Sequence, residues 1–147
     1  MMKIKSVSPE AILCEADPAL REIVELVLQE RFRTRSTSRV SRLPALLDAC
    51  LTLRLLVIDF YKQPRASIYQ ILSNAARDLP STRILLLASE FTLDEQERAI
   101  RLARVSFLPR PFDRTSLLEK IDILTRPGYR PRIRTRIVSL PVRPPRP

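Results

Sequence analysis

Acidic residues follow two of the short apolar runs in this 147-residue chain, at positions where carboxylates can do chemistry. Glu15 and Asp17 come after the run at residues 11–14, and Asp59 follows the run at residues 55–58. Short, wholly apolar runs are typical of buried strands, and open α/β sheets gather their ligand-binding groups at the carboxyl ends of such strands. We therefore expect these carboxylates to lie at one edge of a sheet.

Two later apolar runs end in groups that would complete a charged site. The run at residues 84–87 ends in Ala88 and Ser89, and the run at residues 105–108 is followed by Arg110. Carboxylate oxygens are ligands that hard divalent cations prefer, and a fixed cation or hydroxyl stabilises an anionic group. The four strand ends therefore supply acids, a small or hydroxyl residue, and a cation.

In this order, the four motifs over residues 9–125 resemble the receiver domain of two-component response regulators. In that family, two acids after the first strand hold a divalent metal, and an aspartate after the third strand accepts a phosphoryl group. A Ser or Thr follows the fourth strand, and Lys-Pro follows the fifth. The matching positions here are Glu15 and Ala16, then Asp59, Ala88 and Arg110-Pro111. This pattern indicates a receiver-like domain with an altered switch.

The resemblance implies a role for each residue of the site. Asp59 would be the phosphoacceptor and would share a Mg²⁺ ion with Glu15 and with the backbone carbonyl of Tyr61. Asp17 is a candidate for the missing second acid. Arg110 would bind either the phosphate or Asp59 itself, and it is not a conservative replacement for lysine, because its guanidinium is longer and planar.

Simpler interpretations of the same residues stay open. An acid after a strand is often a cap or turn residue, and Asp17 before Pro18 suffices as a helix N-cap. Ser89 replaces the missing hydroxyl only if its strand shifts by one residue, which would turn the side chain to the other face. Phe107 stands at the family's aromatic switch position, or it is simply part of the core.

Apolar periodicity predicts five strands that alternate with five helices. The strands are expected at residues 11–14, 31–37, 55–58, 84–87 and 105–108, and the helices start at Asp17-Pro18, near Leu43, before Ile68, at Thr92 and at Asp113. Thr92 followed by Glu95 is a capping-box pattern. Alternating elements imply a parallel sheet with helices on both faces. We expect an α/β doubly wound, flavodoxin-like sandwich with strand order 2-1-3-4-5.

The basic charge of the chain lies mainly in its last 22 residues. Residues 126–147 hold seven arginines, six prolines and no acid, whereas the rest carries 19 basic and 16 acidic residues. This composition predicts an extended, largely disordered tail after a receiver-like domain at 9–125, with weak affinity for polyanions. The alternation over residues 132–140 leaves open a strand formed on a partner.

Composition also excludes several classes of protein. The chain has no histidine, so histidine-dependent hydrolases and histidine-ligated zinc enzymes are excluded. Cys14 and Cys50 are expected to be free and buried, which favours a reducing, cytoplasmic location. No apolar run approaches the ~20 residues needed to span a bilayer, so we expect no membrane segment.

Three functions are compatible with the sequence. The first is a phosphorelay receiver module, a phosphoacceptor rather than a turnover enzyme, which takes phosphate on Asp59 from a histidine kinase or phosphotransfer protein. It would signal to an output partner, or as a homodimer, through the face from the fourth to the fifth helix, where Arg98 and Arg101 lie. The second is a phosphate-independent pseudo-receiver, and the third, ranked lowest, is nucleic-acid binding by the tail.

Overall fold

In this computed structural model, residues 9–131 and 137–138 are described. Five parallel strands form one sheet in the order β2-β1-β3-β4-β6. They are β1 (Glu10–Cys14), β2 (Arg33–Thr37), β3 (Leu53–Asp59), β4 (Arg83–Ala88) and β6 (Val105–Pro109). The predicted order 2-1-3-4-5 is confirmed. Only the numbering differs, because a two-residue strand, β5 (Glu90–Phe91), lies between β4 and β6 in sequence.

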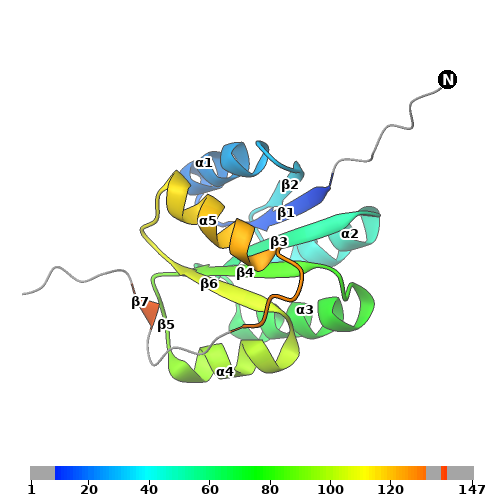
Figure 1. The fold of residues 1–147 in the computed structure, drawn as a ribbon, viewed down its shortest axis with the longest axis vertical. Coiled ribbons are helices and arrows are strands. Elements are labelled where there is room, and N and C mark those ends of the chain that lie inside the picture. The colour runs from blue at the N-terminus through cyan, green and yellow to red at the C-terminus, as the bar shows by residue number, and fades with distance from the viewer. Residues whose placement is uncertain (1–8, 132–136, 139–147) are drawn as a thin grey trace, which may run out of the picture.

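Helices cover both faces of the sheet, which makes the predicted three-layer sandwich (Figure 1). They are α1 (Pro18–Leu28), α2 (Leu43–Ala49), α3 (Arg65–Asp78), α4 (Leu93–Leu102) and α5 (Arg114–Leu124), with a short 3₁₀ turn, η1 (Val40–Arg42), before α2. Helices α1 and α5 pack on one face, and α2, α3 and α4 pack on the other. The fold class expected from alternating strands and helices is therefore confirmed.

The central strands are buried on both sides, which explains their unbroken apolar sequences. Neighbouring residues of a strand face opposite layers, so Ile12 packs among α2, α3 and α4, and Leu13 packs under α1 and α5. Each such side chain contributes about 1.5–3 kcal/mol when it is fully removed from water. The buried face of α1 passes through Val24, Val27 and Leu28, which leaves Ile23 59% exposed.

Side-chain caps set the starts of three helices, as the sequence predicted. Asp17 accepts hydrogen bonds from the first-turn amides of α1, and Asp113 accepts one from the Ser116 amide of α5. The capping box of α4 is complete, since Thr92 and Glu95 each bond the other's backbone N–H. These caps fix where each loop at the carboxyl edge of the sheet ends.

The C-terminal region forms more structure than expected. Tyr129 packs against the core under α1 and α5, beyond the predicted boundary at residue 125. A second short strand, β7 (Ile137–Val138), pairs antiparallel with β5. The strand left open for residues 132–140 thus forms on this chain itself, and residues 132–136 and 139–147 lie outside the described residues.

Both cysteines are free and buried, as predicted. Burial raises the pKa of the Cys14 thiol to about 12 and that of Cys50 to about 11, so neither is a reactive thiolate. Within the described part of the chain, no helix is both long and apolar enough to cross a membrane.

Candidate functional site

Three of the predicted site residues meet at the carboxyl edge of the sheet. Glu15 follows β1 and Asp59 ends β3, and these strands are neighbours with Cys14 paired to Ile58. The two carboxyl groups lie within hydrogen-bonding reach of each other. Arg110 follows β6 and brings its Nε to 3.4 Å from the Asp59 Oδ2. The expected convergence of Glu15, Asp59 and Arg110 is therefore present.

Both carboxyl groups are fully buried, and each is only partly satisfied. The Tyr61 amide donates to the Asp59 Oδ1 at 2.9 Å, and the Asp17 amide donates to the Glu15 Oε2 at 3.4 Å. No hydrogen bond within the described residues reaches the Glu15 Oε1 or the Asp59 Oδ2. Buried oxygens in this condition are costly unless a cation or proton compensates them.

Burial and the close approach of the two carboxyl groups raise the pKa of Glu15. Burial, followed by the neighbouring Asp59 carboxyl group and its negative charge, raises the pKa of Glu15 to about 8. The Asp17 amide and the Arg110 charge act in the opposite direction. In the metal-free protein, Glu15 is therefore mostly protonated at neutral pH, and a divalent cation at this position would favour its ionised form.

The donor set suits a magnesium ion held by few protein ligands. Mg²⁺ prefers oxygen ligands, keeps several waters, and is commonly bound through one or two carboxylates, which matches the two unsatisfied oxygens of Glu15 and Asp59. Asp17 has a different task, because its Oδ1 accepts the Ala19 and Leu20 amides at the start of α1. No group of three His, Cys, Asp or Glu side chains placed to hold a metal occurs among the described residues.

Ala88 and Ser89, the two candidates for the hydroxyl position of the family, lie at the end of β4. Ala88 pairs with Pro109 and is the last residue of β4, and Ser89 follows it outside the strand. Ala88 is buried, whereas Ser89 is exposed and its Oγ lies 3.3 Å from the Arg110 Nη2, which donates to it. The Ser89 hydroxyl is thus bound to the arginine.

Arg110 closes one side of the site. Besides the Asp59 ion pair and the Ser89 bond, its guanidinium lies 5.3 Å from the centroid of the Tyr61 ring, and its side chain is only 21% exposed. A cavity of about 390 Å³ begins beside it, and its charged lining consists of the cations Lys62, Arg65 and Arg110 and the acids Glu90 and Glu95. Arg110 therefore contacts buried Asp59 and also lines a cavity of mixed charge.

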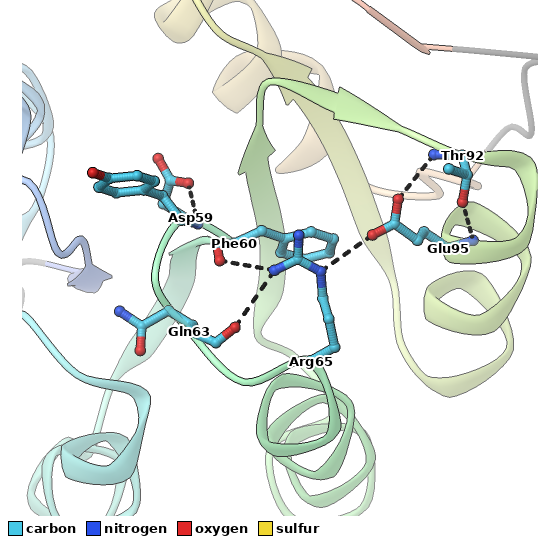
Figure 2. Close-up of polar contacts among 7 residues, drawn as sticks. Asp59, Phe60, Gln63, Arg65, Thr92 and Glu95 are labelled. Carbon is cyan, nitrogen blue, oxygen red and sulfur yellow. Dashed lines mark hydrogen bonds and ion pairs between the residues drawn. The ribbon is translucent and has the colours of Figure 1, made fainter.

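Arg65 is a residue of this region that the sequence pattern did not single out (Figure 2). Its Nη1 donates to the Phe60 carbonyl at 2.8 Å, its Nε pairs with the Glu95 Oε2 at 3.2 Å, and its guanidinium stacks 4.3 Å from the Phe60 ring. Arg65 thus ties the loop after Asp59 to the capping box of α4. An arginine in the first turn opposes the helix dipole, which is the one sequence signal for such a partner.

Gln63 fixes the same loop from its other side and was also not expected. Its side-chain amide donates to the Ser38 carbonyl at 2.8 Å, and its oxygen accepts the Val40 amide at 2.9 Å. Between Gln63 and Asp59, Lys62 adopts a φ of 57°, a left-handed conformation that is strained for a residue with a side chain. The loop that follows Asp59 is thus held in a defined, slightly strained shape.

A row of three aromatic rings lies behind the site. Phe60 and Phe91 meet edge to face with centroids 5.3 Å apart, and Phe91 meets Phe107 in the same way at 5.0 Å. All three are buried, and Phe91 has no exposed surface. Phe107, at the aromatic switch position of the resemblance, is thus also a core residue in contact with β5.

No protein-family model matches the sequence, and no curated protein matches it. Solved structures do match. The signal receiver domain of an HD domain-containing protein from Pseudomonas fluorescens Pf-5 superposes with a TM-score of 0.70 at 18% identity, covering 80% of this chain and 94% of that one.

Two further matches have the same architecture. The orphan response regulator HP1043 of H. pylori gives a TM-score of 0.69 at 18% identity, covering 81% of this chain and 98% of that one. The Vibrio cholerae chemotaxis protein CheY4 gives 0.70 at 14% identity, covering 80% and 99%. This chain therefore has the fold of response-regulator receiver domains, as its motifs predicted.

Proposed function

We propose that this protein is a receiver-type signalling module in which Asp59 accepts a phosphoryl group. The observation that supports this most strongly is the meeting of two buried, incompletely satisfied carboxyl groups with Arg110 at the carboxyl edge of a receiver fold. In this proposal Glu15 and Asp59 hold Mg²⁺ together with the Tyr61 backbone carbonyl. The phosphoryl donor is a histidine kinase or phosphotransfer protein in the cytoplasm.

The residues divide the work of phosphoryl transfer. An Asp59 oxygen forms the new bond to phosphorus as the bond from phosphorus to the donor breaks, and the donor keeps that electron pair. Bound Mg²⁺ would offset charge on the transferring oxygens. Arg110 would exchange its ion pair with Asp59 for one with the phosphoryl oxygens, to which a guanidinium can donate two hydrogen bonds.

Access to Asp59 limits the rate in this proposal. Its side chain has no exposed surface and does not line the neighbouring cavity, whereas Arg110 and Tyr61 do. A donor reaches Asp59 only after Arg110 moves and gives up the ion pair. Because Ala88 has no hydroxyl to bind the product, we expect slow modification and a weak response in the following loop.

Intact-mass spectrometry after incubation with a small phosphodonor and Mg²⁺ tests the proposal. The wild-type chain should gain the mass of one phosphoryl group, and Asp59→Asn should gain none. Asp113→Asn is a matched control, because Asp113 is an exposed cap of α5 and its loss should leave the mass gain intact. Retention of the mass gain in Asp59→Asn would place the acceptor elsewhere.

A second candidate function is a phosphate-independent interaction domain. The specific observation in its favour is that Arg110 already pairs with Asp59, while Ala88 offers no group to detect a phosphate. Complete absence of a mass gain in the wild-type chain, under conditions that phosphorylate a known receiver, would favour this function.

In either function, the face formed by α4, β6 and α5 is our proposed contact surface for an output partner or a second copy. Arg98 on α4 stacks on the Tyr69 ring of α3 at 4.3 Å, and Arg101 lines a cavity together with Ala76 of α3. Polyanion binding by the arginine-rich tail remains a lower-ranked proposal. It predicts an affinity for heparin that falls steeply with salt.

A further inference from the structure

The strand β5 offers an edge for strand addition beside the proposed phosphoacceptor site. It consists of Glu90 and Phe91, directly after Ser89, and it is not part of the five-stranded sheet. A strand with an unpaired edge is a template for pairing with another extended segment. Here β7 fills that edge, with Val138 opposite Glu90 and Ile137 opposite Phe91 in antiparallel register.

The C-terminal segment is anchored before it reaches β5. Gly128 adopts a φ of 77° after α5, the Tyr129 hydroxyl donates to the Val105 carbonyl at 3.0 Å, and the Tyr129 ring packs on the core. Val105 is the first residue of β6, whereas β7 lies beside β5 near the other end of that strand. The C-terminal segment is therefore attached at two points, one near the amino ends and one near the carboxyl ends of the sheet strands (Figure 1).

The connection between these points is long enough to be made within one molecule. Seven residues, 130–136, separate Tyr129 from Ile137 and can span up to roughly 23 Å when extended. The five residues of β6 extend about 16 Å. A second copy of the chain is thus not needed to supply β7.

Charge complementarity favours the same arrangement. Residues 90–97 contain four acids and no basic residue, and residues 126–147 contain seven arginines and no acid. Opposite charges at a contact favour the correct pairing and suppress alternatives. The segment that contains β5 and the segment that contains β7 are therefore opposite in charge.

Docking at β5 acts on the loop that would respond to phosphorylation. The Phe91 ring lies between Phe60, the residue after Asp59, and Phe107 of β6. Ser89, the residue before β5, accepts a hydrogen bond from Arg110, which pairs with Asp59. A strand that holds Glu90 and Phe91 in place therefore also holds the loop after β4. In this chain Ala88 has no hydroxyl through which a phosphate could pull that loop inward.

We propose that residues 137–138 dock in cis as the resident strand of a strand-addition site at Glu90–Phe91, and that they hold the loop after β4 in place. An extended segment of a partner protein reaches this edge only after the resident strand leaves. The inference goes beyond the proposed function, and it does not require that Asp59 be phosphorylated.

Amide hydrogen exchange in the full-length chain tests the docking. Ile137→Pro disrupts β7 and keeps every charge of the tail. Since neighbouring residues of an antiparallel pair alternate in donating to the partner, one of the Glu90 and Phe91 amides should exchange faster by roughly 2- to 10-fold, the factor for one net hydrogen bond. Val142→Pro is the matched control outside β7 and should change neither amide. Equal exchange in wild type and Ile137→Pro would overturn the proposal, as would protection that rises with protein concentration.

A peptide-binding experiment tests two points separately: whether β5 can bind an added strand, and whether β7 of the same chain already occupies it. A synthetic peptide of residues 132–142 should bind full-length Ile137→Pro, whose edge is open, and should not bind the wild type, whose edge is filled. Binding to both chains would overturn cis occupancy, and binding to neither would overturn the strand-addition site. A phosphorylation assay on the same samples keeps failure of this inference distinct from failure of the proposed function.

Discussion

The Asp59 site and the β5–β7 pair lie on either side of Ser89, but they are stabilised by different interactions: charge pairing at the first, and aromatic packing and strand pairing at the second. At the site, Glu15, Asp59 and Arg110 bring buried charges together with two carboxylate oxygens left unsatisfied. At β5, the Phe91 ring is fully buried between two other rings and the backbone is paired with β7. We therefore expect the stability of the first region to depend on pH and cations, and that of the second to depend on packing.

This difference is what we expect of a receiver fold that keeps its phosphoacceptor site but has an altered switch. In the family that the sequence resembles, a hydroxyl after the fourth strand responds to the phosphate. Ala88 lacks that hydroxyl, and the site is joined to the end of β4 by two bonds from Arg110, one from its side chain to Ser89 and one from its amide to the Ala88 carbonyl. The loop is instead held from outside by the tail, which makes the two regions separately testable.

Removing the Phe91 ring should have the largest effect on stability. Phe91→Ala deletes a fully buried aromatic side chain and should lower the free energy of unfolding by about 3–5 kcal/mol. Leu93→Ala, nearby but 43% exposed, should cost less than about 1 kcal/mol. Urea denaturation followed by circular dichroism measures both. A similar small cost for the two variants would show that the aromatic row does not stabilise the loop.

The pH dependence of stability should report the Asp59 site. Because the folded pKa of Glu15 is raised from 4.5 to about 8, its contribution is fully present below pH 4.5 and is lost as the pH rises toward 8. The melting temperature of the metal-free wild type should therefore fall over this range relative to Glu15→Gln, and Mg²⁺ should restore it most at the alkaline end. Parallel pH profiles for the two chains would contradict a buried, proton-sharing pair.

Breaking the ion pair should cost less than removing Phe91. Arg110→Ala leaves buried Asp59 without its counter-charge and should lower the free energy of unfolding by about 1–3 kcal/mol. Asp59→Asn should absorb part of that loss, giving a coupling energy of roughly 0.5–3 kcal/mol in a double-mutant cycle. Additive effects would mean that the 3.4 Å contact contributes nothing to stability.

The smallest effect is expected at the start of α4. Thr92→Ala removes one half of the capping box and should cost about 1 kcal/mol. Thr92→Ser keeps the hydroxyl and should be near neutral. If both substitutions lower the melting temperature equally, the cap hydrogen bond is not what stabilises this end of the helix.

The fold could be predicted because each central strand is apolar throughout and each helix has a cap or a periodic apolar face. Asp59, Glu15 and Arg110 could be placed because parallel strands end at a common edge. Arg65 and Gln63 could not, since their partners lie 30 and 23 residues away and leave no periodic pattern. The pairing of β7 with β5 could not be predicted either, because a two-residue strand in a proline-rich segment leaves no recognisable pattern in the sequence.

The most direct test of this account follows the amides of Glu90 and Phe91 by NMR while a phosphodonor and Mg²⁺ are added to the full-length chain. Intact mass measured on the same sample reports how much protein is modified. The account predicts a gain of one phosphoryl group, with changed signals for Phe60 and Tyr61 beside Asp59 and little change at Glu90 and Phe91. Release of β7, seen as fast exchange at Glu90 and Phe91 in step with the mass gain, would contradict it.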